Sequence, residues 1–141
     1  MRSETKILDM RFIRYLNLFG KITGVQTKNC FMYNNFVIFA VPGELISKAI
    51  GKDGKNVKKL VPIIGKKIKI IALPGSIEDA EKFISQIVAP STFKSLEITE
   101  NEIIISGSTQ DKAALIGRNK VRLLELKKII QSFFGKELKI V

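Results

Sequence analysis

The same order of predicted elements occurs twice along this chain of 141 residues. Each half contains a helix, two strands, a short helix, a tight glycine loop, a longer helix and a last strand. Gly51 in the first loop and Gly117 in the second are 66 positions apart (117 minus 51). Since each half has the length of a small module, the pattern predicts two similar domains, residues 1–74 and 75–141. Two coincidentally similar α+β stretches are the alternative explanation.

Apolar periodicity and turn residues place the elements of the first half. The expected elements are a helix over 4–19 with Ser3 as its N-cap and Gly20 as its stop, strands over 25–33 and 36–41 joined at Asn34-Asn35, a short helix from Pro42 to Gly51, a helix ending at Gly65 and a strand over 67–72.

The second half repeats this order after the turn Leu73-Pro74-Gly75-Ser76. Its expected elements are a helix with a Ser76–Asp79 capping box that Pro90 terminates, strands over 93–99 and 102–106, a short helix with the capping pair Ser108 and Asp111, a helix ending at Gly135 and a strand over 137–141. The turn is too short for a flexible linker, so we expect the two domains to be held in a fairly fixed relation.

The chain carries a formal net charge of +11, from 24 Lys and Arg against 13 Asp and Glu. Such an excess attracts polyanions and makes their association fast and salt-sensitive. Nucleic acid is therefore the expected partner, although surface lysines that only confer solubility give the same composition. Hydrophobic residues make up 45% of the chain, which is enough for a buried core.

Missing residue types narrow the function classes. The sequence has no histidine, so the commonest general base and metal ligand is absent, and we predict neither an enzyme nor a cofactor or small-molecule substrate. Cys30 is the only cysteine and is expected to be a buried, inert thiol in a reducing compartment. No apolar run approaches the roughly 20 residues of a membrane helix, so we expect a cytoplasmic protein without a membrane partner.

The loop Gly51-Lys52-Asp53-Gly54 joins the two helices of the first half. Glycines at both ends permit a tight turn and let a sugar-phosphate approach the backbone. The loop opens into a helix near Lys55, whose free N–H groups and positive dipole end favour an anion. The cations near it in sequence are Lys48, Lys52, Lys55, Lys58, Lys59, Lys66, Lys67 and Lys69. A phosphate site is therefore predicted at this loop.

The stretch from Val41 to Ile70, with Ile50-Gly51-Lys52-Asp53-Gly54 between two helices, resembles a KH domain, whose signature is Ile-Gly-x-x-Gly. A helix and two strands before the loop and one strand after it resemble the prokaryotic (type II) KH topology. Two such modules resemble the archaeal NusA-like proteins over nearly the whole chain. The resemblance implies an α+β fold of two tandem type II KH domains, each a small mixed three-stranded sheet packed by three helices.

The resemblance also implies that the first loop clamps the backbone of about four nucleotides of single-stranded RNA. Together with the cations near the loop, the residues predicted to bind RNA in the first half are Gly51, Lys52, Asp53, Gly54, Lys55, Lys48, Ile50, Val57 and Lys58. Ile46 and Ile68 are further candidates for the wall of an apolar groove. For each apolar residue of this group, packing in the core is the alternative role.

The second loop, Gly117-Arg118-Asn119-Lys120, has a lysine where the last glycine of the signature is expected. The Cβ of Lys120 is expected to crowd a close phosphate, although its ammonium can bind one at longer range. Asn119 tolerates left-handed dihedrals and can take over part of the turn. Because Arg118, Lys120 and Arg122 keep this region basic, RNA clamping and a secondary electrostatic or structural role both stay open.

The NusA-like resemblance implies a transcription factor that binds nascent single-stranded RNA and modulates elongation or termination. Ribosomal RNA binding, or assembly of the ribosome, is an alternative within the same class. A protein-interaction adaptor that docks on RNA polymerase, with incidental basic faces, is an alternative from a different class.

Overall fold

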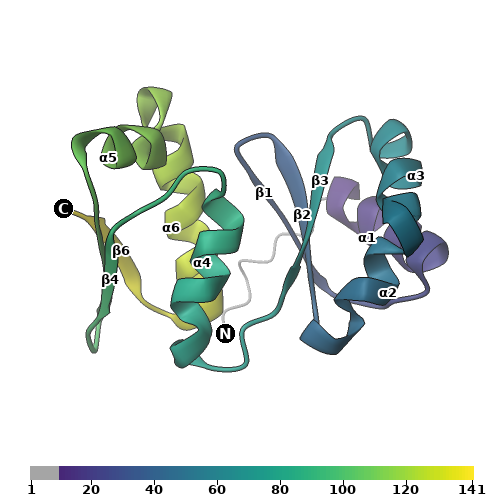
Figure 1. Cartoon of the computed structure of the whole chain (residues 1–141), viewed down its shortest axis with the longest axis horizontal. Helices are drawn as coiled ribbons and strands as arrows, with labels where there is room; N and C mark the ends of the chain where they lie inside the picture. The colour runs from purple at the N-terminus through teal and green to yellow at the C-terminus, as the bar shows by residue number, and fades with distance from the viewer. Residues whose placement is uncertain (1–9) are drawn as a thin grey trace. The chain divides into compact units, whose positions relative to one another are not determined.

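The computed structural model describes residues 10–141, which form two compact units divided between Leu73 and Pro74. Each unit combines helices with a three-stranded sheet of mixed direction, so the α+β class predicted from the sequence is confirmed. In Figure 1, α1, α2 and α3 lie on one side of the first sheet, and α4 and α6 lie on one side of the second. The predicted cap Ser3 and the start of the first helix, residues 4–9, lie outside the described residues.

The first unit contains the predicted elements in the predicted order. They are α1 (Met10–Thr23), β1 (Asn29–Tyr33), β2 (Phe36–Val41), a 3-10 turn (Gly43–Leu45), α2 (Ile46–Ile50), a second 3-10 turn (Lys52–Gly54), α3 (Lys55–Ile64) and β3 (Lys67–Ala72). In the sheet order β1-β2-β3, β1 pairs antiparallel with β2, and β2 pairs parallel with β3. The parallel pair is possible because α2 and α3 carry the chain back to the start of the sheet.

Two boundaries predicted for the first unit are wrong. Helix α1 continues through Gly20 and ends at Thr23, because Gly24, with φ +75°, takes the left-handed conformation that stops a helix. Strand β1 begins at Asn29 rather than Val25. The intervening segment is held by side chains instead of a ladder, since the Thr23 hydroxyl accepts the N–H of Val25 at 3.0 Å.

The helices of the first unit pack on the face of the sheet that carries Val37, Phe39 and Val41. Phe19 of α1 stacks on Phe39 of β2 with ring centroids 4.2 Å apart and planes 17° apart. The buried core of this face comprises Tyr15, Phe19, Val25, Val37, Phe39, Val41, Ala49, Leu60, Ile64 and Ile68. Because both α2 and α3 contribute to it, the loop between them is anchored at both ends.

The second unit repeats the arrangement. Its elements are a 3-10 turn (Ile77–Asp79), α4 (Ala80–Val88), β4 (Ser95–Ile98), β5 (Glu102–Ser106), α5 (Thr109–Ile116), a 3-10 turn (Arg118–Lys120), α6 (Val121–Phe134) and β6 (Glu137–Ile140). The sheet order is β4-β5-β6, again antiparallel and then parallel. Phe83 of α4 lies 4.7 Å from Phe133 of α6 between ring centroids, which joins these two helices.

The capping pair predicted at the start of α5 is confirmed. The Ser108 hydroxyl accepts the N–H of Asp111, and the Asp111 carboxylate accepts the N–H of Ser108, both at 3.0 Å. The backbone hydrogen bond from Ser108 holds the pKa of the Asp111 carboxyl below its ordinary value. This reciprocal cap fixes where α5 begins and therefore where the second loop lies.

The capping box predicted from Ser76 and Asp79 does not form as expected. The Ser76 hydroxyl accepts the N–H of Glu78 at 3.3 Å, and the Asp79 carboxylate accepts the N–H of Gly75 at 2.8 Å. Each side chain therefore satisfies a different donor, because a 3-10 turn precedes α4 and shifts the helical register.

Candidate nucleic-acid interface

The first glycine loop has a backbone shape that few sequences can adopt. Gly51 lies at φ 82°, ψ 165°, Asp53 at φ 55°, ψ 26°, and Gly54 at φ 73°, ψ 20°. The region occupied by Gly51 is almost exclusive to glycine, whereas the left-handed region of Asp53 and Gly54 admits Asn and Asp at modest cost. The first glycine is thus required by geometry and the last is only preferred.

Packing adds a second constraint at Gly51. A Cβ atom built there would lie 2.9 Å from Nδ2 and 3.0 Å from Cγ of Asn56. A Cβ at Gly54 would meet nothing within 4 Å. The surface above Gly54 is therefore open to solvent, while Gly51 sits directly against the side chain that supports the loop.

That support is a buried amide. Asn56, only 6% exposed, lies in the first turn of α3 and donates from Nδ2 to the carbonyl oxygens of Lys48 at 3.2 Å and Ala49 at 3.0 Å. These carbonyls belong to the last turn of α2, where carbonyl oxygens have no N–H donor within the helix. Asn56 therefore ties the end of α2 to the start of α3 and holds the loop between them in one shape. An isolated Asn in a lysine-rich turn carries no periodic signal, so the role of this residue could not be predicted from the sequence.

Two N–H groups of the loop stay available to an outside acceptor. The N–H of Gly54 donates to the Gly51 carbonyl at 3.0 Å, and the N–H of Gly51 donates to the Ser47 carbonyl at 3.0 Å. Within residues 10–141, the N–H groups of Lys52 and Asp53 donate to no backbone carbonyl. Both residues are exposed and lie within three residues of Lys55, the first residue of α3, whose dipole places partial positive charge at this end.

The second loop has the same backbone shape as the first. Gly117 lies at φ 74°, ψ 173°, Asn119 at φ 56°, ψ 24°, and Lys120 at φ 61°, ψ 21°. The N–H of Lys120 donates to the carbonyl of Gly117 at 3.1 Å, as Gly54 does to Gly51. A lysine therefore occupies a left-handed position at a cost of about 1–2 kcal/mol, and the turn is kept.

Arg122 corresponds to Asn56 at the 66-residue offset and has the same supporting role under its loop. Its Nη1 donates to the carbonyl oxygen of Ala114 at 3.1 Å, and a Cβ at Gly117 would lie 2.9 Å from its Cγ. The arginine stem therefore lies under the second loop and its guanidinium binds the end of α5. Its predicted contact with RNA would compete with this contact, whereas Arg118, Asn119 and Lys120 are all exposed.

The lysines predicted around the first loop divide into two groups. Those on α2, the loop and the first turns of α3 are all exposed: Lys48, Lys52, Lys55, Lys58 and Lys59. Lys66 and Lys67 follow the far end of α3, about 15 Å along a ten-residue helix from the loop. Lys66, Lys67 and Lys69 therefore lie outside the group of exposed lysines on α2, the loop and the first turns of α3.

The distant lysines gather instead at the start of β2. The ammonium of Lys69 lies 4.8 Å, and that of Lys67 5.8 Å, from the centroid of the Phe36 ring. Burial lowers the pKa of Lys69 from its ordinary value. Both ammonium groups therefore make cation–π interactions with the Phe36 ring.

The apolar candidates for a groove also separate. Ile68 is 9% exposed and belongs to the core, so it cannot line a groove. Ile46 and Val57 are half-buried and pack against that core with one side. Ile50, half-buried at the end of α2, is directly adjacent to the loop. The partly exposed set beside the loop is thus Ile46, Ile50 and Val57.

No group of three Cys, Asp or Glu side chains within residues 10–141 could hold a metal ion. Burial raises the pKa of the Cys30 thiol from 9.0 to about 12, so the reactive thiolate is scarce at neutral pH.

No helix in residues 10–141 is both long and apolar enough to cross a bilayer.

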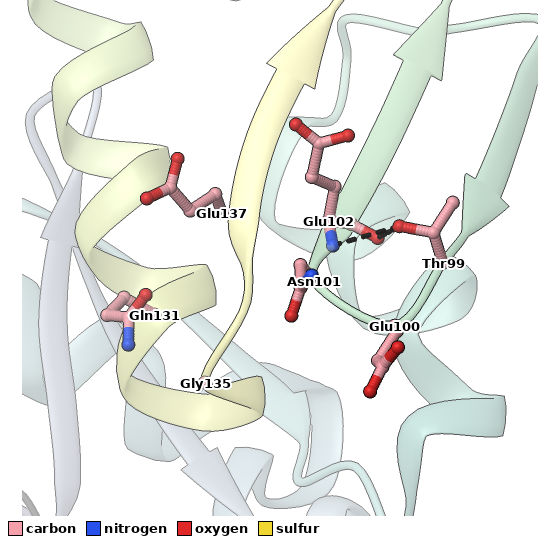
Figure 2. Close-up of a pocket in the computed structure, with 7 residues that line it drawn as sticks. All are labelled: Thr99, Glu100, Asn101, Glu102, Gln131, Gly135 and Glu137. Carbon is pink, nitrogen blue, oxygen red and sulfur yellow. Dashed lines mark hydrogen bonds between the residues drawn. The ribbon is translucent and has the colours of Figure 1, made fainter.

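A separate pocket of about 630 Å³ lies at one end of the second sheet (Figure 2). Glu100, Glu102 and Glu137 line it, together with the turn that follows Thr99. Figure 2 shows Thr99 bonded to Glu102, whose N–H donates to the threonine hydroxyl at 3.0 Å. The three carboxylates disfavour a phosphate in this pocket, although Lys139 pairs with Glu102 at 3.5 Å.

Comparison with known proteins finds archaeal relatives at modest identity. A probable transcription termination protein NusA of Halococcus morrhuae is 27% identical over 110 residues, which cover 76% of this chain and 77% of that protein. Proteins of the same name from Methanococcus vannielii and Methanocaldococcus jannaschii are 31% and 37% identical over 100 and 78 residues. These matches cover 70% and 55% of this chain, but only 56% and 41% of those proteins.

The fold has a counterpart among solved structures. The crystal structure of APE1850 matches with a TM-score of 0.66 and 26% sequence identity, over 95% of this chain and 100% of that one. No family model matches the chain. The comparisons thus support a NusA-like relation and a shared two-unit fold.

Proposed function

We propose that this chain is a NusA-like transcription factor that binds nascent single-stranded RNA, and that its two units are KH-type domains. The observation that carries the proposal is the loop Gly51–Gly54, where the N–H groups of Lys52 and Asp53 have no backbone acceptor and exposed lysines lie around the start of α3. The names of the archaeal relatives supply the link to transcription termination.

In this proposal the first loop holds one RNA phosphate. The N–H groups of Lys52 and Asp53 donate to its oxygens, and the dipole of α3 favours its charge. The missing Cβ at Gly54 lets the sugar-phosphate backbone lie close to the loop. The side chains of Lys48, Lys55 and Lys58 then attract the neighbouring phosphates.

Bases on either side of the clamped phosphate would lie along the half-buried side chains of Ile46, Ile50 and Val57. Such a shallow apolar wall accepts unpaired bases but not a duplex, whose bases are stacked inside. The proposal therefore includes a preference for single strands.

The second loop contributes more weakly. Its backbone is competent, but the Cβ of Lys120 stands where Gly54 leaves open space. We propose diffuse attraction by Arg118 and Lys120 there, with Arg122 positioning the loop rather than contacting RNA. Ribosomal RNA remains a second candidate ligand, because the clamp described here would hold any accessible single strand.

The test is a charge reversal at the clamp with a matched reversal elsewhere in the first unit. Lys52→Glu is expected to weaken binding of a mixed-sequence RNA of about 12 nucleotides by about 5–30-fold, since it replaces an attraction with a repulsion of about 1 kcal/mol each. Lys21→Glu, on an exposed face of α1, changes the net charge equally and is expected to cost less than about 3-fold.

Arg118→Glu in the second loop is expected to fall between these two variants. Fluorescence anisotropy at matched salt measures all three affinities, and far-UV circular dichroism verifies folding. An equal loss for Lys52→Glu and Lys21→Glu would show that binding follows net charge alone. Equal affinity of the wild-type chain for duplex and single strand would contradict the KH groove.

A further inference from the structure

The helix after the second loop differs in one systematic way from the helix after the first. Three exposed lysines of α3, Lys55, Lys58 and Lys59, correspond to Val121, Leu124 and Glu125 of α6 at the 66-residue offset. Because the two loops share their dihedral angles, this difference lies in the side chains and not in the backbone.

Val121 and Leu124 are strongly exposed, at 51% and 53%. They are three residues apart on α6, so their side chains are neighbours on one face of the helix. The core of the second unit instead takes Leu126, Ile129 and Ile130 from this helix. Neither exposed residue is therefore explained by packing within the unit.

Helix stability does not explain these residues either. Valine forms helices less well than lysine, so Val121 lowers the helix propensity of the turn that it occupies. Exposing two large apolar side chains together also carries a solubility cost that lysine at these positions would avoid. A partner that covers both side chains would remove this cost.

The surroundings of the pair indicate the chemistry of that partner. Exposed cations lie on both sides of it: Arg118 and Lys120 in the loop, and Lys127 and Lys128 one turn further along α6. Glu125 lies on the same helix but is half-buried and already engaged. An apolar centre with a basic rim is complementary to apolar side chains flanked by carboxylates.

We propose that Val121 and Leu124, with their rim of Arg118, Lys120, Lys127 and Lys128, dock an acidic amphipathic segment of a partner protein. In the first unit, the cations of the loop and of α3 bind phosphate. In the second unit, the corresponding face of α6 binds a protein, although the backbone of the loop has the same shape. Two apolar side chains form a small contact, so binding is expected to be weak and reversible. The proposal does not depend on RNA binding by the first loop.

The test is a selection from a displayed library of random peptides of about 12 residues against the full chain, repeated with the double variant Val121→Lys/Leu124→Lys. The variant restores the residue types that α3 carries at these positions, so the helix is expected to form. Leu124→Gln is a milder second variant. Circular dichroism verifies the fold of both.

Peptides enriched by the wild-type chain are expected to contain at least two acidic and two apolar residues. They are expected to lose about 10-fold or more in affinity for the double variant, and to weaken for Lys127→Glu/Lys128→Glu because that change reverses the rim. Enrichment that is absent, unaffected by the double variant or independent of acidic residues overturns the proposal.

Two further measurements separate the other possible occupants. Sedimentation velocity that shows a dimer lost in the double variant would identify a second copy of this chain as the occupant. A fall in RNA affinity in the double variant would make the face an RNA contact. Either result overturns the proposal. We expect the chain to be a monomer, and we expect the RNA affinity of the double variant to stay equal or to rise with the added lysines.

Discussion

Replacing Gly51 by alanine is expected to destabilise the first unit through two separate effects. At φ 82°, ψ 165° an alanine occupies a region that costs a non-glycine residue about 1–3 kcal/mol. Its Cβ would also lie 2.9 Å from Nδ2 of Asn56, and overpacking a tight site costs about 1–3 kcal/mol more. The free energy of unfolding is therefore expected to fall by about 2–6 kcal/mol.

The same substitution at Gly54, three residues later in the same loop, is the matched control. Gly54 lies in the left-handed helical region, where alanine costs about 1–2 kcal/mol, and its Cβ would meet nothing within 4 Å. Gly54→Ala lacks the packing term entirely. Lys120 already demonstrates that a side chain is accommodated at the equivalent position.

The chain offers a probe that reports on the first unit alone. It contains two tyrosines and no tryptophan, and Tyr15 and Tyr33 both lie in the first unit. Tyrosine fluorescence during urea unfolding therefore measures this unit while the second contributes no signal. If Gly51→Ala costs no more than Gly54→Ala, the argument that geometry and Asn56 together require the first glycine is wrong.

Two further predictions concern the second loop and the half-buried thiol of Cys30. Lys120→Gly is expected to raise the free energy of unfolding of the second unit by about 1 kcal/mol, measured by thermal circular dichroism; a fall in stability would show that the lysine makes a favourable contact in the folded unit. Because burial raises the pKa of Cys30 to about 12, the folded thiol holds its proton more tightly than the unfolded one. This contribution to stability is therefore complete below pH 9.0 and is lost as the pH rises from 9.0 toward 12. A Cys30→Ala variant is expected to lack this part of the alkaline loss, so identical alkaline profiles for the two proteins would contradict it.

Element type and order could be predicted from the sequence because the signals were local. Alternating apolar residues and the Asn34-Asn35 turn give the β1–β2 hairpin, and both asparagines have positive φ as that turn requires. Gly65 and Gly135 end α3 and α6 in the left-handed conformation. At these places one residue determines the backbone, so no long-range contact is needed to recognise it.

The errors arose where a contact distant in sequence decides. Gly20 resembles a helix stop, yet α1 continues because Phe19 packs on Phe39 and holds the last turn in place. Lys66 and Lys67 are near the loop in sequence but follow the far end of α3, and Lys69 belongs to β3. Asn56 and Arg122 gave no sequence signal, because their role depends on carbonyl groups eight residues earlier that only the turn between helices brings within reach.

Comparison of the two loops shows that the glycine signature predicts the shape of the turn but not its function. Gly51 and Gly117 share a dihedral region that nearly excludes other residues, so the first glycine reports that the turn exists. The residue type at the last position is less informative about the turn, since Gly54 and Lys120 adopt the same conformation. Function must then depend on the side chains around the turn. Lysines after the first loop favour phosphate, whereas Val121 and Leu124 after the second cannot, so an intact turn alone does not establish that a loop binds RNA.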